Sequence, residues 1–214
     1  MNLPNRHGMM IIISSPSGAG KSTICKMLLK NESSLQISVS VTTRERRQSE
    51  IEGQDYFFIS KDDFLEMKNN NQLLEYAEIY GNSYGSPSKI IFDQLNQGVD
   101  ILFDIDWQGA RQIYQNCSKY NIISIFILPP SINELYNRLQ KRAEDSKEVI
   151  QKRLQNAKTE IQHFNEYDYV IINSKVEDTF KQIEQIINTE RLKRHRNPYL
   201  IQFIEGMISD KASC

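Results

Sequence analysis

A glycine-rich turn near the N-terminus constrains this chain more than any other feature. The turn reads Ser15-Pro16-Ser17-Gly18-Ala19-Gly20-Lys21-Ser22-Thr23. It follows the apolar run 9–14 and precedes the amphipathic run 24–30, so the order is strand, turn and helix. In that context the turn predicts a phosphate-binding loop, because free backbone N–H groups and the positive end of a helix dipole face an anion there.

The residue types within the turn suit a nucleoside triphosphate. Gly18 and Gly20 let the backbone approach an anion closely. Lys21 offers a positive charge to phosphate oxygens, and Ser22 offers a hydroxyl to Mg²⁺. Ser15 replaces the first glycine of the pattern G-x-x-x-x-G-K-[ST], and a serine fits there if its φ is negative. We therefore expect residues 15–23 to bind a nucleoside triphosphate with Mg²⁺, whereas a turn that only starts a helix leaves the lysine and the serine unexplained.

The remaining apolar runs predict a parallel sheet. Residues 9–14, 101–105, 122–128 and 169–172 are continuously apolar, which is typical of strands that are buried on both faces. Residues 37–41 are expected to supply a fifth strand. Helical patterns lie between the runs, so we predict an α/β fold, a three-layer P-loop NTPase core with a parallel sheet. Ligands of such folds bind at the carboxyl ends of the strands.

Two acidic residues follow one of these strands. Asp104 ends the apolar run, where it can hold Mg²⁺ or its waters together with Ser22. The alternative for Asp104 is a strand-end acid that caps a helix. Asp106 lies two residues further and shares the side of Asp104 while strand geometry lasts.

Arginines indicate a second anion site and a group that stabilises phosphoryl transfer. Arg44 and Arg47 lie in a polar loop within residues 42–88, where the strands are short and polar aromatic residues are frequent. We expect this segment to form an inserted lobe of mixed α/β structure. Arg138 and Arg142 are four residues apart on a predicted helix, so they share one face. Guanidinium groups there can stabilise a transferring phosphoryl group, although solvated helix surface is the alternative.

Sequence signals also predict where three helices begin. Ser60 with Asp63, and Ser131 with Glu134, match the pattern of a helix N-cap. Ser86 before Pro87 is typical of an N-cap followed by proline at the first helical position.

Ordered motifs over about residues 9–190 resemble the guanylate kinase family. They are Ser38-Val39-Ser40, Thr42-Thr43-Arg44 with Arg47, Gly53-x-Asp55-Tyr56-x-Phe58, Glu75-Tyr76-Ala77, Gly81-Asn82-x-Tyr84-Gly85-Ser86, Asp104-Ile105-Asp106-x-Gln108-Gly109, and Pro129-Pro130-Ser131 to Arg138 and Arg142. The resemblance implies a core of residues 1–41, 89–137 and 156–214. It also implies a GMP-binding lobe of residues 42–88 and a helical lid of residues 138–155.

The resemblance further implies roles for individual residues. GMP would be bound by Ser40, Arg44, Arg47, Tyr56, Glu75, Tyr84, Ser86 and Asp106. The catalytic residues would be Lys21, Arg138, Arg142 and Arg153, and Asn173 would lie near the adenine of ATP. The chemistry is consistent, because a carboxylate such as Glu75 accepts both N1–H and N2–H of guanine, a donor pair that adenine lacks.

The implied activity is transfer of the γ-phosphoryl group of ATP to GMP or dGMP in purine nucleotide metabolism. Two alternatives stay open at this point. One is a non-catalytic guanylate-kinase-like binding module, which would not need the phosphate loop. The other is a related kinase of a sugar phosphate, which would not need Ser40 and Glu75.

The net charge, the apolar runs and the cysteines limit the kinds of partner and compartment that we expect for this chain. The formal net charge is −1 and 25% of residues are charged, which excludes a dominant electrostatic attraction to nucleic acid or to an acidic membrane. No apolar run approaches the about 18 residues of a membrane span. Cys25, Cys117 and Cys214 lack metal-like spacing, and residues 1–8 lack an apolar signal core, so we expect cytoplasmic localisation. The predicted partners are ATP and GMP, and the sequence leaves a homodimer open.

The two ends of the chain carry few signals. Residues 1–8 read as a loose tail, and the basic run 191–196 reads as the solvated end of a helix whose cations match the helix dipole.

Overall fold

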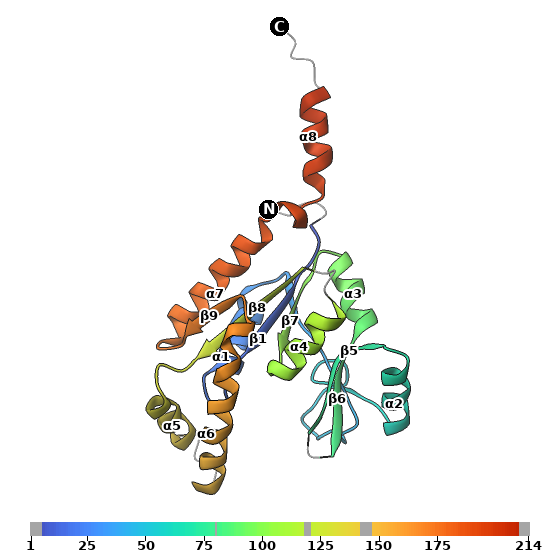
Figure 1. The fold of residues 1–214 in the computed structure, drawn as a ribbon. Helices are drawn as coiled ribbons and strands as arrows, with labels where there is room; N and C mark the ends of the chain where they lie inside the picture. The colour runs from blue at the N-terminus through green and yellow to red at the C-terminus, as the bar shows by residue number, and fades with distance from the viewer. Residues whose placement is uncertain (1–5, 80, 118–120, 142–146, 210–214) are drawn as a thin grey trace.

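A parallel sheet forms the centre of the molecule (Figure 1). The computed structural model describes residues 6–79, 81–117, 121–141 and 147–209. The sheet has the order β2-β7-β1-β8-β9, and every neighbouring pair is parallel. Its strands are β1 (Met10–Ser14), β2 (Leu35–Ile37), β7 (Asp100–Asp104), β8 (Ile122–Leu128) and β9 (Tyr169–Ile172). The strands expected from the continuous apolar runs are therefore confirmed.

Helices cover both faces of this sheet. The helices α1 (Lys21–Asn31) and α7 (Val176–Arg191) pack on one face, and α3 (Ser88–Asn96) and α4 (Trp107–Asn116) pack on the other. The sequence of β1 is apolar throughout because both faces of this strand are buried. Ile11 and Ile13 join the cluster under α1 and α7, whereas Met10 and Ile12 join the cluster under α3 and α4. The predicted three-layer α/β fold is confirmed.

A second, smaller sheet lies beside the first. It contains β3 (Val41–Thr42), β4 (Phe57–Phe58), β5 (Leu73–Ile79) and β6 (Asn82–Pro87) in the order β4-β3-β6-β5, with α2 (Lys61–Asn69) packed against it. Strand β3 is parallel to β4 and antiparallel to β6, which is antiparallel to β5. The Ser60 side chain accepts from Asp63 N at 3.0 Å, so the predicted cap of α2 is confirmed.

Three details of the region before α3 differ from the sequence expectation. The predicted strand 37–41 divides, because Leu35–Ile37 pairs with β7 and Val41–Thr42 belongs to the second sheet. Strand β6 was not expected, since its glycine, serines and proline disfavour strands, and pairing with β3 and β5 overrides this preference. Ser86 is not an N-cap, since α3 begins one residue later than expected and Pro87 holds the cap position.

Two further helices flank the phosphate loop. They are α5 (Ile132–Lys141) and α6 (Lys147–Ile161), and the 3₁₀ helix η1 (Gln162–Glu166) follows α6. Leu135, Leu139 and Ala157 are buried where α5 and α6 pack together. The predicted lid boundaries, 137/138 and 155/156, fall inside these two helices. Arg142 lies outside the described residues.

The C-terminal segment was not predicted. After α7 come the 3₁₀ helix η2 (Arg194–Arg196) and α8 (Tyr199–Ser209), which projects away from the body of the molecule (Figure 1). None of the helices in the part of the chain that the structure describes is both long and apolar enough to cross a membrane.

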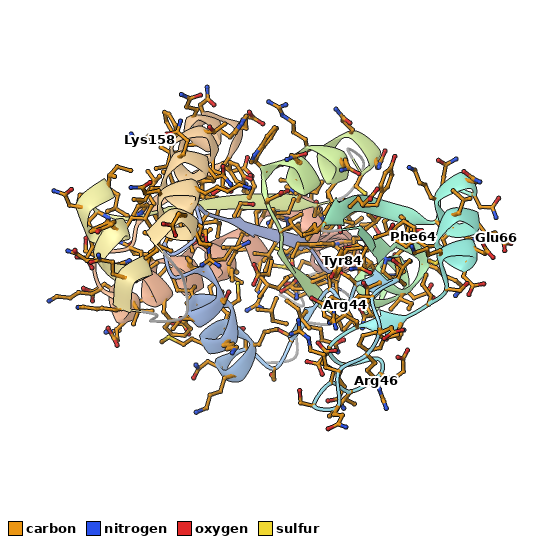
Figure 2. All side chains as sticks on the ribbon, turned by 90° about the horizontal axis from the view of Figure 1, so that it is seen from below. Arg44, Arg46, Phe64, Glu66, Tyr84 and Lys158 are labelled. Carbon is orange, nitrogen blue, oxygen red and sulfur yellow. The ribbon has the colours of Figure 1, made fainter. Side chains whose placement is uncertain are left out.

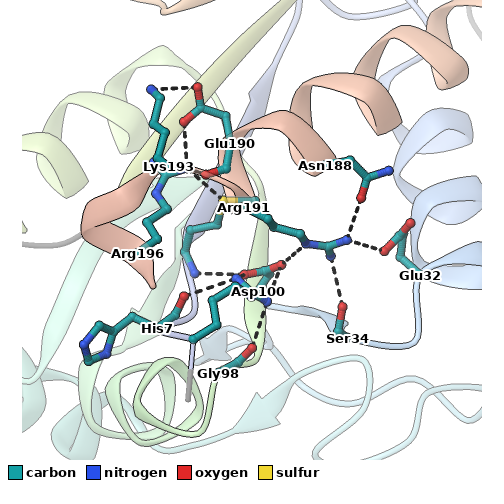
Figure 3. A network of polar contacts seen from close by, with 12 residues as sticks. His7, Glu32, Ser34, Gly98, Asp100, Asn188, Glu190, Arg191, Lys193 and Arg196 are labelled. Carbon is teal, nitrogen blue, oxygen red and sulfur yellow. Dashed lines mark hydrogen bonds and ion pairs between the residues drawn. The ribbon is translucent and has the colours of Figure 1, made fainter. Parts of the chain in front are cut away.

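A buried ionic network ties both ends of the chain to the amino end of β7 (Figure 3). Asp100 is fully buried, and its carboxylate accepts from Arg6 at 2.6 and 3.0 Å, from Arg191 Nε at 2.9 Å and from Met9 N at 3.0 Å. Arg191 Nη1 also lies 2.8 Å from Glu32 Oε2. The expected loose tail is thus wrong from Arg6 onward, because this side chain is 9% exposed and paired.

A second ion pair lies beside this network. Arg196 is 3% exposed and its Nη1 lies 2.6 Å from Oε2 of Glu190, which is 2% exposed. Tyr169 donates to the other oxygen of Glu190 at 2.7 Å. The expectation that the basic run 191–196 is solvated is therefore wrong for Arg191 and Arg196, since each has a buried carboxylate partner. Sequence spacing alone does not reveal such partners.

We predict that Asp100→Asn lowers the free energy of unfolding by about 3–5 kcal/mol, because it leaves the guanidinium groups of Arg6 and Arg191 buried without their shared counter-charge. Asp93→Asn is the control, since Asp93 forms an exposed pair with Lys89 and its loss costs about 0.5 kcal/mol or less. Urea unfolding of both variants measures the difference. Equal small losses would show that the network does not stabilise the fold.

Candidate functional site

The phosphate loop joins the carboxyl end of β1 to the first turn of α1. Gly18 has φ +93° and Gly20 has φ +103°, a region that side chains rarely adopt. Among the described residues other than glycine, only Asn71 has a positive φ. Ser15 therefore has the negative φ that a serine needs at this position. The substitution of serine for the first glycine of the pattern is therefore compatible with the loop.

Asn173, directly after β9, supports the loop from below. It is 3% exposed, its Nδ2 donates to Ala19 O at 2.7 Å, and its Oδ1 accepts from Thr179 Oγ1 at 3.0 Å. A Cβ atom on Gly20 would lie 2.4 Å from Asn173 Nδ2. The amide is thus buried and bonded on both sides, which makes Asn173 a support of the loop. Its expected place near the adenine of ATP stays a prediction.

Lys21 and Asp104 face each other across the loop. Lys21 Nζ lies 2.7 Å from Asp104 Oδ1 and donates to Ile105 O at 3.1 Å. Ser22 is exposed in the first turn of α1. A cavity of about 310 Å³ is lined by the loop together with Asp104, Asp106 and Glu160. The predicted donor residues are therefore brought together from separate segments.

These oxygen atoms fit a magnesium ion that also binds phosphates. Ser22 and Asp104 offer the hard oxygen ligands that Mg²⁺ prefers. Among the residues that the structure describes, no group of three or more His, Cys, Asp or Glu side chains could hold a metal. Mg²⁺ usually takes one or two protein ligands and completes its shell with substrate phosphates and water.

Asp106 takes the capping role that was the alternative for Asp104. Its Oδ1 accepts from Gln108 N and Gly109 N, both at 3.0 Å, so it is the N-cap of α4. Asp106 nevertheless lines the cavity at the loop. Asp106 is thus held in a defined position by the helix that it caps.

Two side chains from α5 and α6 reach the loop. The Arg138 guanidinium donates to Asn173 O at 3.0 Å and to Ala19 O at 3.4 Å, while its Nε donates to Glu134 at 2.9 Å. Glu134 therefore contributes only its backbone N–H to the expected cap with Ser131 Oγ.

Glu160 was missed by sequence reasoning, although its Oε2 accepts from Ser17 N at 3.3 Å. Burial raises the pKa of the Glu160 carboxyl.

Arg153 lies on the same helix as Glu160, seven residues earlier and therefore on the same face. Their seven-residue spacing along α6 is a sequence signal that could have indicated that Arg153 and Glu160 lie on one face.

A separate cluster on the small sheet combines an arginine with two phenols. The Arg44 guanidinium carbon lies 5.5 Å from the centre of the Tyr56 ring, and the rings of Tyr56 and Tyr84 are 5.8 Å apart. Figure 2 shows Arg44 and Tyr84 close together, whereas Arg46 lies at the outer edge of the lobe. Three of the predicted phosphate-binding residues therefore converge.

Glu50 organises the arginines of this cluster and was missed from sequence. Its Oε1 lies 2.6 Å from Arg44 Nη2, and its Oε2 accepts from Arg47 N at 2.8 Å. The hydrogen bond from Arg44 holds the pKa of the Glu50 carboxyl below its usual value. Glu50 thus links Arg44 to the backbone of Arg47, which keeps the loop between β3 and β4 folded around the cluster.

Glu75 lies in a buried polar chain between the two sheets. It is 7% exposed, and Ser86 Oγ donates to its Oε1 at 2.6 Å. Ser38 Oγ in turn donates to Ser86 Oγ at 3.3 Å. Ser40 is half-buried in the segment between β2 and β3, and the contact of Ser38 with Ser86 was not predicted.

Burial raises the pKa of the Glu75 carboxyl, the Ser86 hydrogen bond offsets part of that rise, and the charge of Asp106 adds to it. Glu75 is therefore a buried acceptor close to Asp106, which itself lines the cavity at the phosphate loop.

Helix α4 joins the small sheet to the core. Gln112 exchanges two hydrogen bonds of 3.0 Å with the backbone of Tyr76, and Asn116 Nδ2 donates to Leu74 O at 2.8 Å. These three bonds hold β5 on either side of Glu75. A Cβ atom on Gly109 would lie 3.3 Å from Glu75 Oε2, so glycine admits this close approach.

Known proteins resemble this chain along nearly all of its length. Residues 7–190 match the family described as guanylate kinase. The guanylate kinase of Agrobacterium fabrum (strain C58) is 50% identical over 206 residues, covering 96% of this chain and 93% of that protein. The guanylate kinase of Rhizobium meliloti (strain 1021) is 50% identical over 205 residues, with 96% and 93% covered. A crystal structure of guanylate kinase from Anaplasma phagocytophilum superposes with a TM-score of 0.75 at 37% identity, covering 97% of this chain and 98% of that chain.

We predict that Gly20→Ala weakens ATP binding at least tenfold. The new Cβ would displace the Asn173 amide and force a side chain into positive φ, a strain of about 1–3 kcal/mol. Gly206→Ala in α8 is the control, because nothing lies within 4 Å of its Cβ position. Titration with ATP measures both. Unchanged ATP affinity in Gly20→Ala would contradict the role given to this close contact.

Proposed function

The chain belongs to the guanylate kinase family and phosphorylates GMP with ATP, and we propose that the two clusters described above are the donor and acceptor halves of its active site. One observation carries this assignment. Asp106 lines the cavity at the phosphate loop, and its carboxylate accepts from Gly109 N at 3.0 Å, while a Cβ atom on Gly109 would lie 3.3 Å from Glu75 Oε2. A donor phosphate at the loop and a base beside Glu75 would therefore lie in one continuous site.

The donor half would be formed by residues 15–23. Backbone N–H groups of the loop and the start of α1 face the phosphates, and Lys21 moves its charge from Asp104 onto the β- and γ-phosphate oxygens. Ser22 and Asp104 would hold Mg²⁺, which supplies charge to the donor phosphates. Asn173 acts here by fixing the loop, since its amide is buried beneath Ala19.

The acceptor half would bind both ends of GMP. Arg44, Arg47, Tyr56 and Tyr84 supply donors for the phosphate. At the other end, Glu75 accepts the N1–H and N2–H pair of guanine, and Ser40, Ser86 and Asp106 complete the polar surroundings. The same contacts accept dGMP, because they involve the base and the phosphate.

The arginines of α5 and α6 would stabilise the transferring phosphoryl group. Arg138 already lies at the loop, where it donates hydrogen bonds to backbone carbonyls. We propose that Arg138, Arg142 and Arg153 turn to the equatorial oxygens as residues 138–155 close over residues 42–88. Transfer is then in line between two bound anions, so positioning and charge stabilisation account for catalysis and no covalent intermediate forms.

Two other functions agree less well with these residues. A non-catalytic binding module has no use for Lys21 paired with Asp104 at a folded phosphate loop. A sugar-phosphate kinase has no use for the buried Glu75, whose carboxylate would remain without the donors that guanine provides. The free, buried thiols of Cys25 and Cys117 favour a reducing compartment, so we propose the cytoplasm as the site of action.

The direct experiment measures ADP formed from ATP and Mg²⁺ in the presence of GMP, dGMP, AMP or ribose 5-phosphate. We expect turnover with GMP and dGMP and background rates with the other two acceptors. Preference for ribose 5-phosphate, or binding of GMP without ADP formation, would reject the proposed function.

We predict that Glu75→Gln raises the KM for GMP by about tenfold or more, because the amide presents a donor where guanine also donates. The wild-type KM should also rise as pH falls toward the raised pKa of Glu75, since protonation removes the same acceptor. Glu75→Gln should lose this part of the pH dependence. The GMP phosphate itself titrates near pH 6 in both proteins and is therefore a shared background.

Glu78→Gln is the matched control on the same strand, because Glu78 is exposed. If Glu75→Gln and Glu78→Gln have equal KM values and pH profiles, Glu75 does not recognise the base.

A further inference from the structure

Helix α6 carries a carboxylate into the cavity at the phosphate loop. Glu160 is half-buried, and its Oε2 accepts from Ser17 N at 3.3 Å. The other described residues that line this cavity belong to the loop, to the start of α1, or to the end of β7 and the residues after it. A negative charge in this cavity opposes the binding of an anionic triphosphate. Affinity for ATP therefore does not account for Glu160.

Apolar contacts place α5 and α6 directly on the loop. A Cβ atom on Gly18 would lie 3.0 Å from side-chain carbons of both Leu135 and Leu139 on α5. These two leucines share a buried cluster with Ala157 of α6. Apolar contact is non-directional, whereas a hydrogen bond has a preferred geometry. Polar groups therefore decide how α6 is oriented on the loop.

Two polar contacts join these helices to the loop, and they differ in charge. Arg138 on α5 donates to Ala19 O at 3.4 Å, whereas Glu160 on α6 accepts from Ser17 N. In the proposed reaction Arg138 turns to the transferring phosphoryl group and leaves Ala19. Phosphate repels a carboxylate, so Glu160 does not follow Arg138. The contact between Glu160 and Ser17 is thus suited to stay in place during transfer.

The carboxyl-terminal end of α6 is also fixed on α4. In η1, which follows α6, Glu166 accepts from Arg111 of α4 at 2.7 and 2.8 Å. The ring of His163 stacks on Trp107 of α4 with the ring centres 3.7 Å apart. Glu160 is next to the last residue of α6 and therefore lies at its fixed end. The rest of the helix is the part that closure of the lid would move.

We propose that Glu160 is the pivot of α6 on the phosphate loop, and that it positions Arg153 for the transferring phosphoryl group. Arg153 lies seven residues earlier on the same face, which is about 10 Å along the helix. A small rotation of α6 about its fixed end grows over this distance, so the hydrogen bond with Ser17 sets where the Arg153 guanidinium stands. This role of Glu160 rests on the phosphoryl-stabilising role proposed above for Arg153.

The test measures the single-turnover rate of phosphoryl transfer from ATP to GMP and the Kd of ATP. Glu160→Ala should slow transfer about tenfold, since a misplacement of about 1 Å can cost up to about 100-fold. Its Kd for ATP should stay the same or fall, because a negative charge leaves the cavity. Glu160→Gln should recover most of the rate, because the amide oxygen still accepts from Ser17 N. Gln155→Ala, at an exposed position of α6, is the control and should match wild type.

A double variant tests whether Glu160 acts through Arg153. Once Arg153→Ala has removed the guanidinium, adding Glu160→Ala should slow transfer by less than about twofold more. Thermal unfolding of each variant checks that it is folded at the assay temperature.

Four results would overturn the pivot. They are a wild-type rate in Glu160→Ala, equal losses in Glu160→Gln and Glu160→Ala, a raised Kd for ATP in Glu160→Ala, and additive losses in the double variant. The second would assign the effect to charge, and the third would make Glu160 a support of ATP binding. A wild-type rate in Arg153→Ala would instead reject the role proposed for Arg153, so the two proposals fail in distinguishable ways.

Discussion

The contact between the phosphate loop and Asn173 is the constraint on which the site depends. Gly18 and Gly20 give the loop a backbone path at positive φ, and the space above Asn173 leaves no room for a Cβ at Gly20. The buried amide of Asn173 and the guanidinium of Arg138 both donate to Ala19 O, so the loop is held from β9 and from α5 at once. The position of the donor phosphates thus follows from packing among residues that lie far apart in the sequence.

Helix α4 extends this constraint to the proposed acceptor half. Its N-cap Asp106 lies at the phosphate loop, and its side chains Gln112 and Asn116 hold the strand that carries Glu75. The distance between the two halves is therefore set by one rigid element rather than by a flexible linker.

Local patterns predicted the core and the residue types of the site but not the long-range partners. Continuous apolar runs identified the strands of the parallel sheet, because a strand that is buried on both faces consists almost entirely of apolar residues. The run 37–41 was read as one strand, since local sequence does not show where a chain passes between sheets. Glu50 and Glu160 were missed because each acts through a contact made only in the folded chain. Asp100 was read only as part of a strand, although it pairs with arginines near both ends of the chain. Helix α8 lacks the packing signals of a core helix, and none of its residues is buried in the part of the chain that the structure describes.

The central claim is that the phosphate loop and the Glu75 cluster are two halves of one site. A compound that joins adenosine to guanosine through a polyphosphate chain tests this directly by calorimetry and competition. The account predicts one molecule bound per chain, more tightly than ATP or GMP alone, with displacement by either nucleotide. Two molecules bound per chain, or displacement by only one of the two nucleotides, would contradict it.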